Sequence, residues 1–262
     1  MKQKIYQIDA FADSVFSGNP AAVCPLDHWL SDTLLQKIAL ENNLAETAFY
    51  VRQGDQYQIR WFTPTVEVDL CGHATLAAAF VLFNHENHQG NSIHFQSPRS
   101  GKLTVTKNEE LLTLNFPTDQ VEEVALTEEI THCFSIKPHA AFKGKTDYLL
   151  VFDSEEEIKN IIPNLATISK LIGRGVIVTA KGDKVDFVSR FFAPQSGIDE
   201  DPVTGSAHTT LTPYWAKQLG KTELSALQLS ERRGSLLCTY LNDRVEISGQ
   251  GKLYLIGEIF VD

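Results

Sequence analysis

The hydrophobic and polar positions along the chain predict short strands interrupted by a few helices. Residues 1–10 alternate between apolar and polar side chains, which is the period of a half-buried strand, and further segments rich in Val, Ile, Phe and Tyr resemble them. Helical periodicity is predicted over residues 31–42, 74–84 and 207–219, with Ser31 a suitable N-cap for the first. The pattern therefore predicts a mixed α+β fold in which the helix at 31–42 covers the outside.

One short pattern occurs twice in the chain. Residues 60–64 read Arg-Trp-Phe-Thr-Pro, and residues 190–194, which lie 130 positions later, read Arg-Phe-Phe-Ala-Pro. Each copy continues through an acidic loop to a glycine and an apolar helix, at residues 72–76 and 205–209. Because the order strand, loop, glycine, helix is kept as well as the motif, the repeat predicts two similar halves.

The joint between the halves is expected in the segment 116–124, which carries Pro117 and several acidic residues. We therefore place an N-terminal half at residues 1–117 and a C-terminal half at 118–262. The final strand, near residues 253–262, is a candidate to cross back to the first half.

Composition excludes several classes of function. The 262-residue chain has a formal net charge of −10 and no Lys/Arg run, so its field would repel nucleic acid. No apolar run is long enough to span a bilayer, and the first residues lack the apolar segment of a signal peptide. The four cysteines are widely spaced without a CxxC pair, which indicates reduced thiols in a cytoplasmic protein.

The two glycines that open helices are candidate binding positions. The first backbone N–H groups of a helix lack intrahelical partners and carry the positive end of the helix dipole, so they bind carboxylates or phosphates. If the halves face each other, Gly72-His73 and Gly205-Ser206 would hold an anion between them. Each glycine taken singly is better explained as a simple turn residue, whereas for the duplicated pair the two explanations are about equal.

Three side chains are candidates for acid/base chemistry, and a fourth, Cys71, is a candidate for thiol chemistry. Glu46 enters an apolar strand, where partial burial would suit it to proton transfer, although an ordinary surface carboxylate is the commoner explanation from sequence alone. Asp201 precedes the second helix start and is also explained as a turn or capping residue. His73 titrates near neutral pH, and Cys71 precedes a helix start, where the pKa of a thiol is expected to fall.

No metal site is expected. His85 and His88 lie three positions apart beside Glu86, but the surrounding polar stretch offers no further ligands.

Four segments of the chain together resemble the phenazine-biosynthesis PhzF-like isomerase family, and the resemblance extends over essentially the whole chain. They are Gly-Asn-Pro-Ala-Ala-Val at 18–23, Glu-Thr at 46–47, Leu-Cys-Gly-His-Ala-Thr at 70–75 and Asp-Pro-Val-Thr-Gly-Ser-Ala-His at 201–208. The resemblance implies the fold of diaminopimelate epimerase, with two pseudo-symmetric halves, each a curled β-sheet around a central helix.

The resemblance also implies roles for individual residues. Glu46 matches the catalytic acid/base of the family, Asp201 matches an acidic residue that holds or protonates the substrate, and His73 is a proton-transfer or binding partner. The substrate-binding positions that match are Gly72, His73, Gly205 and Ser206. The implied reaction moves a proton from one carbon to another on a small carboxylate, without a cofactor.

Two other functions remain open at this point. An amino-acid racemase or epimerase of the same fold would use a cysteine from each half, but Cys71 has no counterpart near Gly205. A non-catalytic anion-binding protein would keep the helix starts and lose turnover. The sequence does not specify the substrate, since fold does not fix function. A homodimer is the expected oligomeric state, because such assemblies are common among soluble enzymes and in this family.

Overall fold

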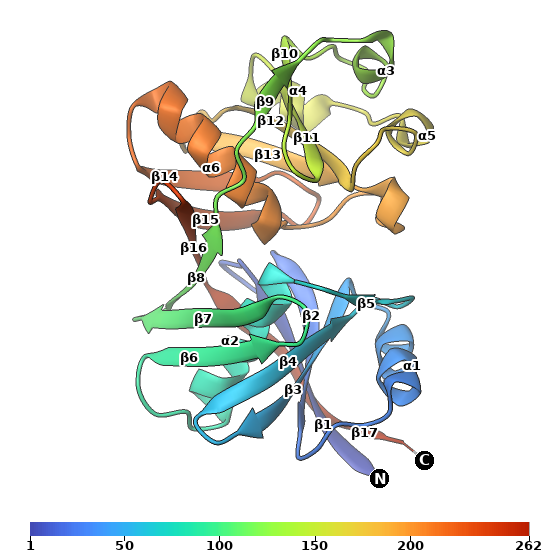
Figure 1. Cartoon of the computed structure of the whole chain (residues 1–262), viewed down its shortest axis with the longest axis vertical. Coiled ribbons are helices and arrows are strands. Elements are labelled where there is room, and N and C mark those ends of the chain that lie inside the picture. Colours follow the sequence, from blue (N-terminus) through green and yellow to red (C-terminus); the bar gives the residue numbers. More distant parts are fainter. Residues whose placement is uncertain (262) are drawn as a thin grey trace. The chain divides into compact units, whose positions relative to one another are not determined.

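A computed structural model describes residues 1–261 of the chain, which divide into two compact units (Figure 1). The first unit holds Met1–Asn115 together with the chain from Ser248 onward, and the second holds Phe116–Ile247. The last strand of the chain therefore belongs to the first unit.

The first unit is built on one sheet with helices at its parallel crossovers. Its strands are β1 (Lys2–Ala10), β2 (Asn19–Leu26), β3 (Glu46–Gln53), β4 (Gln56–Phe62), β5 (Glu67–Val68), β6 (Ser92–Ser97), β7 (Gly101–Asn108), β8 (Leu111–Pro117) and β17 (Gly251–Phe260). The order is β17–β1–β2–β3–β4–β6–β7–β8, and β5 pairs with β4. Only β2–β3 and β4–β6 are parallel; these pairs need crossovers, which α1 (Asp32–Asn42) and α2 (Gly72–His85) supply.

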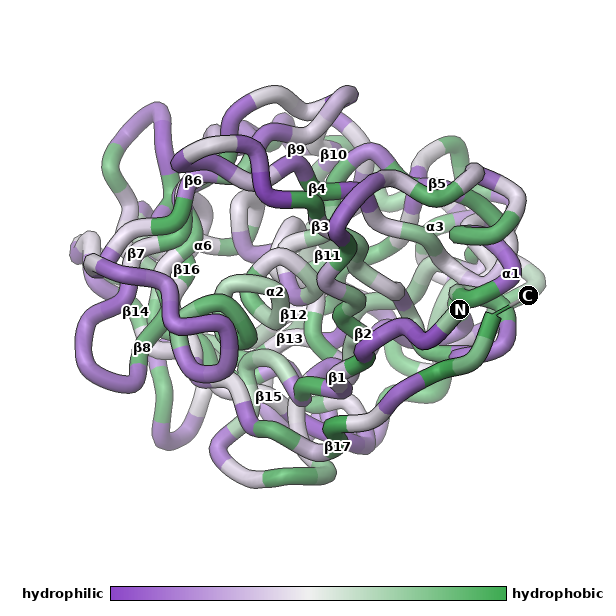
Figure 2. The backbone as a smooth tube through the Cα atoms, turned by 90° about the horizontal axis from the view of Figure 1, so that it is seen from below, coloured by the Kyte–Doolittle hydropathy of each residue, from purple (hydrophilic) through white to green (hydrophobic). Residues whose placement is uncertain are grey.

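Helix α2 is the central helix of the first unit. Nine of its 14 residues are buried, and it packs against β1, β2, β3 and β17. The hydrophobic colouring of the backbone along α2 in Figure 2 fits this position, because a helix that is apolar all round must be enclosed. By contrast, α1 buries one face, and the Ser31 side chain accepts a hydrogen bond from the N–H of Leu34, as expected of an N-cap.

The second unit repeats this plan. Its strands are β9 (Glu122–Val124), β10 (Ala140–Lys143), β11 (Asp147–Val151), β12 (Gly175–Lys181), β13 (Phe187–Phe192), β14 (Glu223–Gln228), β15 (Gly234–Tyr240) and β16 (Arg244–Gly249). Its helices are α3 (Glu128–Thr131), α4 (Glu155–Asn160), α5 (Leu165–Ile168) and α6 (Gly205–Leu219), with a 3-10 turn at Pro194–Ser196. Nine of the 15 residues of α6 are buried, so this helix is central in the same sense as α2.

The two sheets share one pattern of strand directions. From β1 to β7 through β2, β3, β4 and β6, neighbours run antiparallel, parallel, antiparallel, parallel and antiparallel. From β10 to β15 the directions follow the same sequence. In each unit the central helix lies in the segment of chain that connects the two strands of the second parallel pair, β4 to β6 or β13 to β14. The predicted α+β fold with two pseudo-symmetric halves is confirmed.

An arginine–glutamate pair is duplicated with the strands. On β4, Arg60 donates from Nε and Nη2 to the two carboxylate oxygens of Glu67, at 2.7 and 2.8 Å. On β13, Arg190 makes the same two bonds to Glu200, also at 2.7 and 2.8 Å. Each guanidinium also lies over a phenylalanine two residues later, Phe62 or Phe192. Each pair ties the acidic loop, which leads to the central helix, back to its strand.

The ion pair of the second unit should contribute measurably to stability. Replacing Arg190 by Met would leave Glu200, whose side chain is only 25% exposed, without its charged partner. We expect the free energy of unfolding to fall by about 2–3 kcal/mol, measured by urea denaturation followed by tryptophan fluorescence.

The matched control is Asp153→Asn, because Asp153 pairs with His139 on the surface at side-chain exposures of 77% and 50%. This change should alter stability by less than about 0.5 kcal/mol. Equal effects of the two substitutions would contradict a stabilising role for the duplicated pair.

Candidate functional site

Glu46 is the first residue of β3, and the end of α1 sets its position. The C-cap of helix α1 is Asn43, which has a left-handed φ of 48° and donates its N–H to the carbonyl of Ala39. The side chain of Asn42 then donates to Thr47 Oγ1 at 3.0 Å, which links the helix end to the start of the strand. Glu46 pairs in register with Ala21 on the parallel strand β2 and is 9% exposed. Its carboxylate is therefore buried.

His73 on α2 is the partner of this carboxylate. Its Nε2 lies 3.1 Å from Glu46 Oε2, and its Nδ1 lies 3.2 Å from the side-chain amide of Asn19 on β2. Cys71, the residue before α2, places its sulfur 3.6 Å from the same Nδ1. These four residues, Asn19, Glu46, Cys71 and His73, form one buried cluster, which we call the Glu46 group.

The protonation states of the Glu46 group follow from burial and from neighbouring charge. Burial by itself lowers the pKa of His73, whereas the Cys71 sulfur, when it is a thiolate, and the Glu46 carboxylate raise it well above its ordinary value. Burial and the nearby Glu46 raise the pKa of Cys71 to about 11, so Cys71 is a thiol at neutral pH. Glu46 is then the negative charge that His73 faces, and the pair can take a proton on the carboxylate and supply one from the imidazolium.

The expectation that the helix start lowers the pKa of Cys71 is wrong. The thiol is 6% exposed, and the loss of water around a thiolate outweighs the favourable helix dipole and the contact with His73.

Both central helices begin without a side-chain cap. Gly72 and Gly205 are the first residues of α2 and α6, and their N-cap residues are Cys71 and Thr204, neither of which makes a side-chain capping hydrogen bond to its helix. The N–H groups of these first residues have no intrahelical partner, so both helix starts offer donors to an anion. The position equivalent to Cys71 in the second unit is thus a threonine.

Asp201 lies in a clamped loop before α6. It is 8% exposed, and its Oδ2 accepts from Thr204 Oγ1 at 2.6 Å. Gln228, at the end of β14, holds both ends of the loop: its Oε1 accepts from the Thr204 N–H, and its Nε2 donates to the Asp201 carbonyl, each at 2.8 Å. The clamp fixes the orientation of the Asp201 carboxylate.

Ser206 is held by an arginine that the sequence did not single out. Arg174 donates from Nη1 to Ser206 Oγ at 2.8 Å. Its other nitrogens contact the carboxylate of Asp147, which is 1% exposed, and its guanidinium lies over the ring of Phe191. The guanidinium of Arg174, whose charge is balanced by Asp147, therefore lies beside the start of α6. Because it donates to Ser206 Oγ, Ser206 can turn its own hydroxyl proton toward a ligand.

No sequence signal distinguished Arg174, Asp147 or Gln228 from other polar residues. Each acts through a partner 24 or more positions away in the chain, and only the folded strands bring them together.

The structure therefore brings together the predicted residues of each unit. In the first, Glu46 and His73 are in contact and Gly72 adjoins them; in the second, the loop from Asp201 leads directly to Gly205 and Ser206. Their catalytic and binding roles remain predictions.

The histidine pair that was set aside as a metal site has other contacts. The ring of His85 contacts the ring of Tyr6 in a tilted arrangement, while His88 contacts the hydroxyl of Tyr57 and the carbonyl of Ser92. Among the described residues, the group whose donor atoms do cluster is Glu46, Cys71 and His73, whose ligand atoms lie within 4.8 Å of one another.

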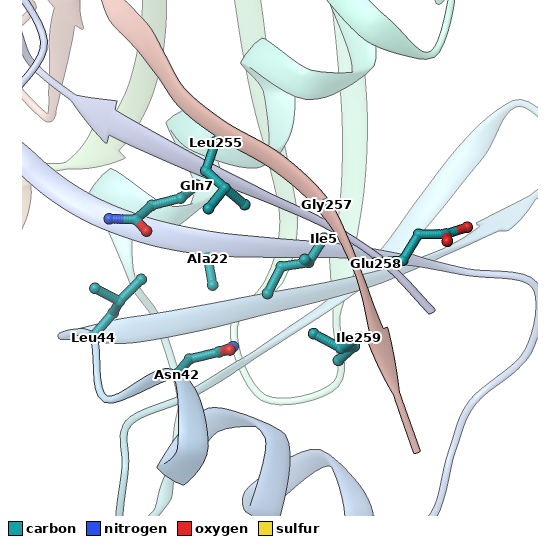
Figure 3. A pocket seen from close by; sticks show the side chains of 9 residues that line it. All are labelled: Ile5, Gln7, Ala22, Asn42, Leu44, Leu255, Gly257, Glu258 and Ile259. Carbon is teal, nitrogen blue, oxygen red and sulfur yellow. The ribbon is translucent and has the colours of Figure 1, made fainter. Parts of the chain in front are cut away.

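A cavity of about 310 Å³ lies elsewhere in the first unit (Figure 3). Figure 3 shows Ile5, Leu44, Leu255 and Ile259 around it, between the strands β1 and β17 and the end of α1. None of the predicted site residues lines this cavity, so we do not assign the chemistry to it.

The imidazole of His73 should be protonated at neutral pH. We expect nitrogen NMR of the histidine rings to give His73 a pKa above 6.5, and Glu46→Gln to drop it sharply, because burial remains while the negative charge is gone. Since the folded-state pKa is raised, the stabilisation by this pair is complete below about pH 6.5 and is lost as pH rises through the folded-state pKa.

His208 is the internal control for this titration. It is fully buried, contacts the Thr204 carbonyl at 2.9 Å through Nδ1, and burial lowers its pKa to about 4. It should stay neutral from pH 5 to pH 8 in both proteins. A neutral His73 at pH 7 in the unsubstituted protein would contradict the charged pair.

No helix among the described residues is long and apolar enough to cross a membrane.

Comparison with known proteins identifies the family. A family described as phenazine biosynthesis-like protein matches residues 8–256. An uncharacterized isomerase of Pseudomonas aeruginosa is 50% identical over 259 residues, covering 99% of both chains. The human phenazine biosynthesis-like domain-containing protein is 37% identical and also covers 99% of both chains.

Solved structures agree with these sequence matches. The crystal structure of a PhzF-family protein from Enterococcus faecalis has a TM-score of 0.97 at 49% identity and covers 100% of both chains. A predicted epimerase from Pseudomonas aeruginosa, at 20% identity, shares the fold with a TM-score of 0.74 over 99% of this chain. With its two repeated units and the PhzF-like motifs placed at their helix starts, this chain belongs to the PhzF-like isomerase family.

Proposed function

We propose that this isomerase moves a proton from one carbon to another on a small carboxylate metabolite, without a cofactor, and that Glu46 is its acid/base. The observation that carries the proposal is the buried contact of 3.1 Å between Glu46 Oε2 and His73 Nε2 at the start of α2. A carboxylate in such a place is dry, held in one orientation and beside a proton donor, which are the requirements of general acid/base catalysis.

The proton transfers balance within the substrate and Glu46. The carboxylate of Glu46 removes a proton from an acidic carbon, and the electron pair left behind spreads into the conjugated system of the substrate. The proton on Glu46 then passes to a different carbon, which completes the isomerisation and restores the carboxylate. His73, as an imidazolium, holds Glu46 in place through Nε2, while its Nδ1 faces the side chain of Asn19.

We assign recognition of the substrate to the helix starts. Gly72 and His73 at α2, and Gly205 and Ser206 at α6, offer backbone donors to a carboxylate. Arg174 donates to Ser206 Oγ at 2.8 Å, which leaves the Ser206 hydroxyl proton free to be donated to an anion at the second of these positions. Asp201, fixed by Thr204 and Gln228, is the proposed second acidic group, which holds or protonates the substrate.

The racemase alternative has less support than proton transfer by a carboxylate. Two-thiol racemisation needs a thiolate or a thiol from each half, and the position equivalent to Cys71 is Thr204. With a pKa of about 11, Cys71 is also almost entirely a thiol at neutral pH, so it provides hardly any thiolate to act as the base.

We also propose that the enzyme works in the cytoplasm as a homodimer. All four cysteines are free and buried, as a reducing compartment allows. On β17, the side chains of Tyr254, Ile256 and Phe260 are 49%, 51% and 74% exposed, an apolar surface that a second copy would cover. Light scattering of the purified chain should give twice the mass of one chain, and a monomer at micromolar concentration would contradict this assembly.

The acid/base role of Glu46 is tested by isotope exchange. The unsubstituted enzyme is incubated in heavy water with a panel of small carboxylates that includes trans-2,3-dihydro-3-hydroxyanthranilate. It should introduce deuterium into at least one of them, which NMR of the carboxylate detects. Glu46→Gln should lower exchange by at least about 100-fold while binding is largely kept, because the amide cannot accept the proton.

The matched control is Glu41→Gln, which changes an exposed carboxylate on α1 and should leave exchange unchanged. Exchange that persists in Glu46→Gln would refute the assignment. A compound that binds tightly but never exchanges would instead favour the anion-binding protein.

A further inference from the structure

The Glu46 group contains three different metal-binding atoms. Glu46 offers a carboxylate oxygen from the start of β3, Cys71 a sulfur from the N-cap of α2, and His73 an imidazole nitrogen from its first turn. All three atoms lie within 4.8 Å of one another. We propose that this trio is a binding site for a borderline-soft divalent cation of the Zn²⁺ class, and that the bound cation switches off the acid/base function of Glu46.

Two of the three ligands are already close to a tetrahedral arrangement, and the third reaches it by a side-chain rotation. Zn²⁺ bonds of about 2.0–2.1 Å to nitrogen and oxygen and about 2.3 Å to sulfur place neighbouring ligands about 3.4 Å (N to O) and about 3.6 Å (N to S) apart. Here His73 Nε2 lies 3.1 Å from Glu46 Oε2. Cys71 Sγ lies 3.6 Å from His73 Nδ1 and 3.9 Å from Nε2, so the Cys71 side chain must turn toward Nε2 to bind the same ion.

Charge balance also favours the cation. A thiolate, a carboxylate and a neutral imidazole around Zn²⁺ sum to zero, so the buried site stays neutral when the metal takes the place of the protons on Cys71 and His73. Sulfur and imidazole ligands select Zn²⁺ and Cu⁺ or Co²⁺ over Mg²⁺ and Ca²⁺, which prefer oxygen.

A second shell for this ion is already in place. The side-chain amide of Asn19 lies 3.2 Å from His73 Nδ1, so it orients the ring with Nε2 toward Glu46. Three protein ligands leave the fourth position open to water.

Metal binding is independent of the proposed function, whereas the inhibition rests on it. A Glu46 oxygen that is bound to the cation cannot accept a proton from a substrate carbon. Zn²⁺ should therefore stop deuterium exchange in the enzyme.

The binding test uses the untagged full chain after treatment with a chelator. Isothermal titration with Zn²⁺ should give one ion per chain, and Cys71→Ser should weaken binding at least tenfold, since even second-shell changes cost about 10–100-fold. With Co²⁺ as the probe, a thiolate-to-metal charge-transfer band should appear in the unsubstituted protein and be absent from Cys71→Ser.

Two controls separate this site from other thiols and from surface histidines. Cys24→Ala removes a fully buried thiol of the same unit that is outside the Glu46 group, and His139→Gln removes an exposed imidazole beside Asp153. Both should keep the stoichiometry, the affinity and the charge-transfer band. Glu46→Gln removes the anionic oxygen ligand and should also weaken binding. Because this second variant tests the same site, a folding defect in Cys71→Ser alone would not explain a loss of binding in both.

The outcomes are distinct. Loss of one Zn²⁺ site in both Cys71→Ser and Glu46→Gln, with the controls unchanged, supports the proposal. Binding that survives both changes, or the absence of any ion, overturns it. If Zn²⁺ binds as described but the enzyme exchanges no proton in any tested carboxylate, the metal site stands and the proposed function fails.

Discussion

A buried carboxylate must be neutralised, and at the start of β3 the imidazole of His73 does this for Glu46. Removing either partner leaves a charge or an unpaired polar group in a place that water does not reach, which costs several kcal/mol. The contact exists only because the end of the first parallel crossover lies beside the start of the helix of the second: α1 returns the chain to β3, and the loop after β5 delivers it to α2. The chemistry that we propose depends on this constraint, because it keeps the carboxylate dry, oriented and paired.

The two units keep one architecture but differ in their chemistry. The strand directions, the uncapped central helices and the bidentate arginine–glutamate pair are the same in both. At the helix starts the side chains have diverged. The first unit places a carboxylate, an imidazole and a thiol there, whereas the second places Arg174 against Ser206 and a clamped Asp201. A duplicated scaffold thus presents one start suited to proton transfer and one suited to binding an anion.

The Glu46 group can neutralise its carboxylate in two ways. A proton on His73 gives an ion pair, and a divalent cation shared with the Cys71 sulfur gives a neutral complex. Only the first leaves Glu46 available to a substrate. The composition of this cluster therefore connects the stability of the first unit, its proposed catalysis and its sensitivity to metal ions.

The sequence by itself determined the repeat, the helix starts at Gly72 and Gly205, the cap at Ser31 and the family, because these depend on residues close together in the chain or on motifs. Only the tertiary structure decided that Glu46 is buried, that Cys71 is a thiol and that Arg174, Asp147 and Gln228 support the second helix start. The physical reason is distance along the chain: burial and pKa depend on neighbours that strand pairing brings from 24 to 54 residues away, and no local pattern encodes them.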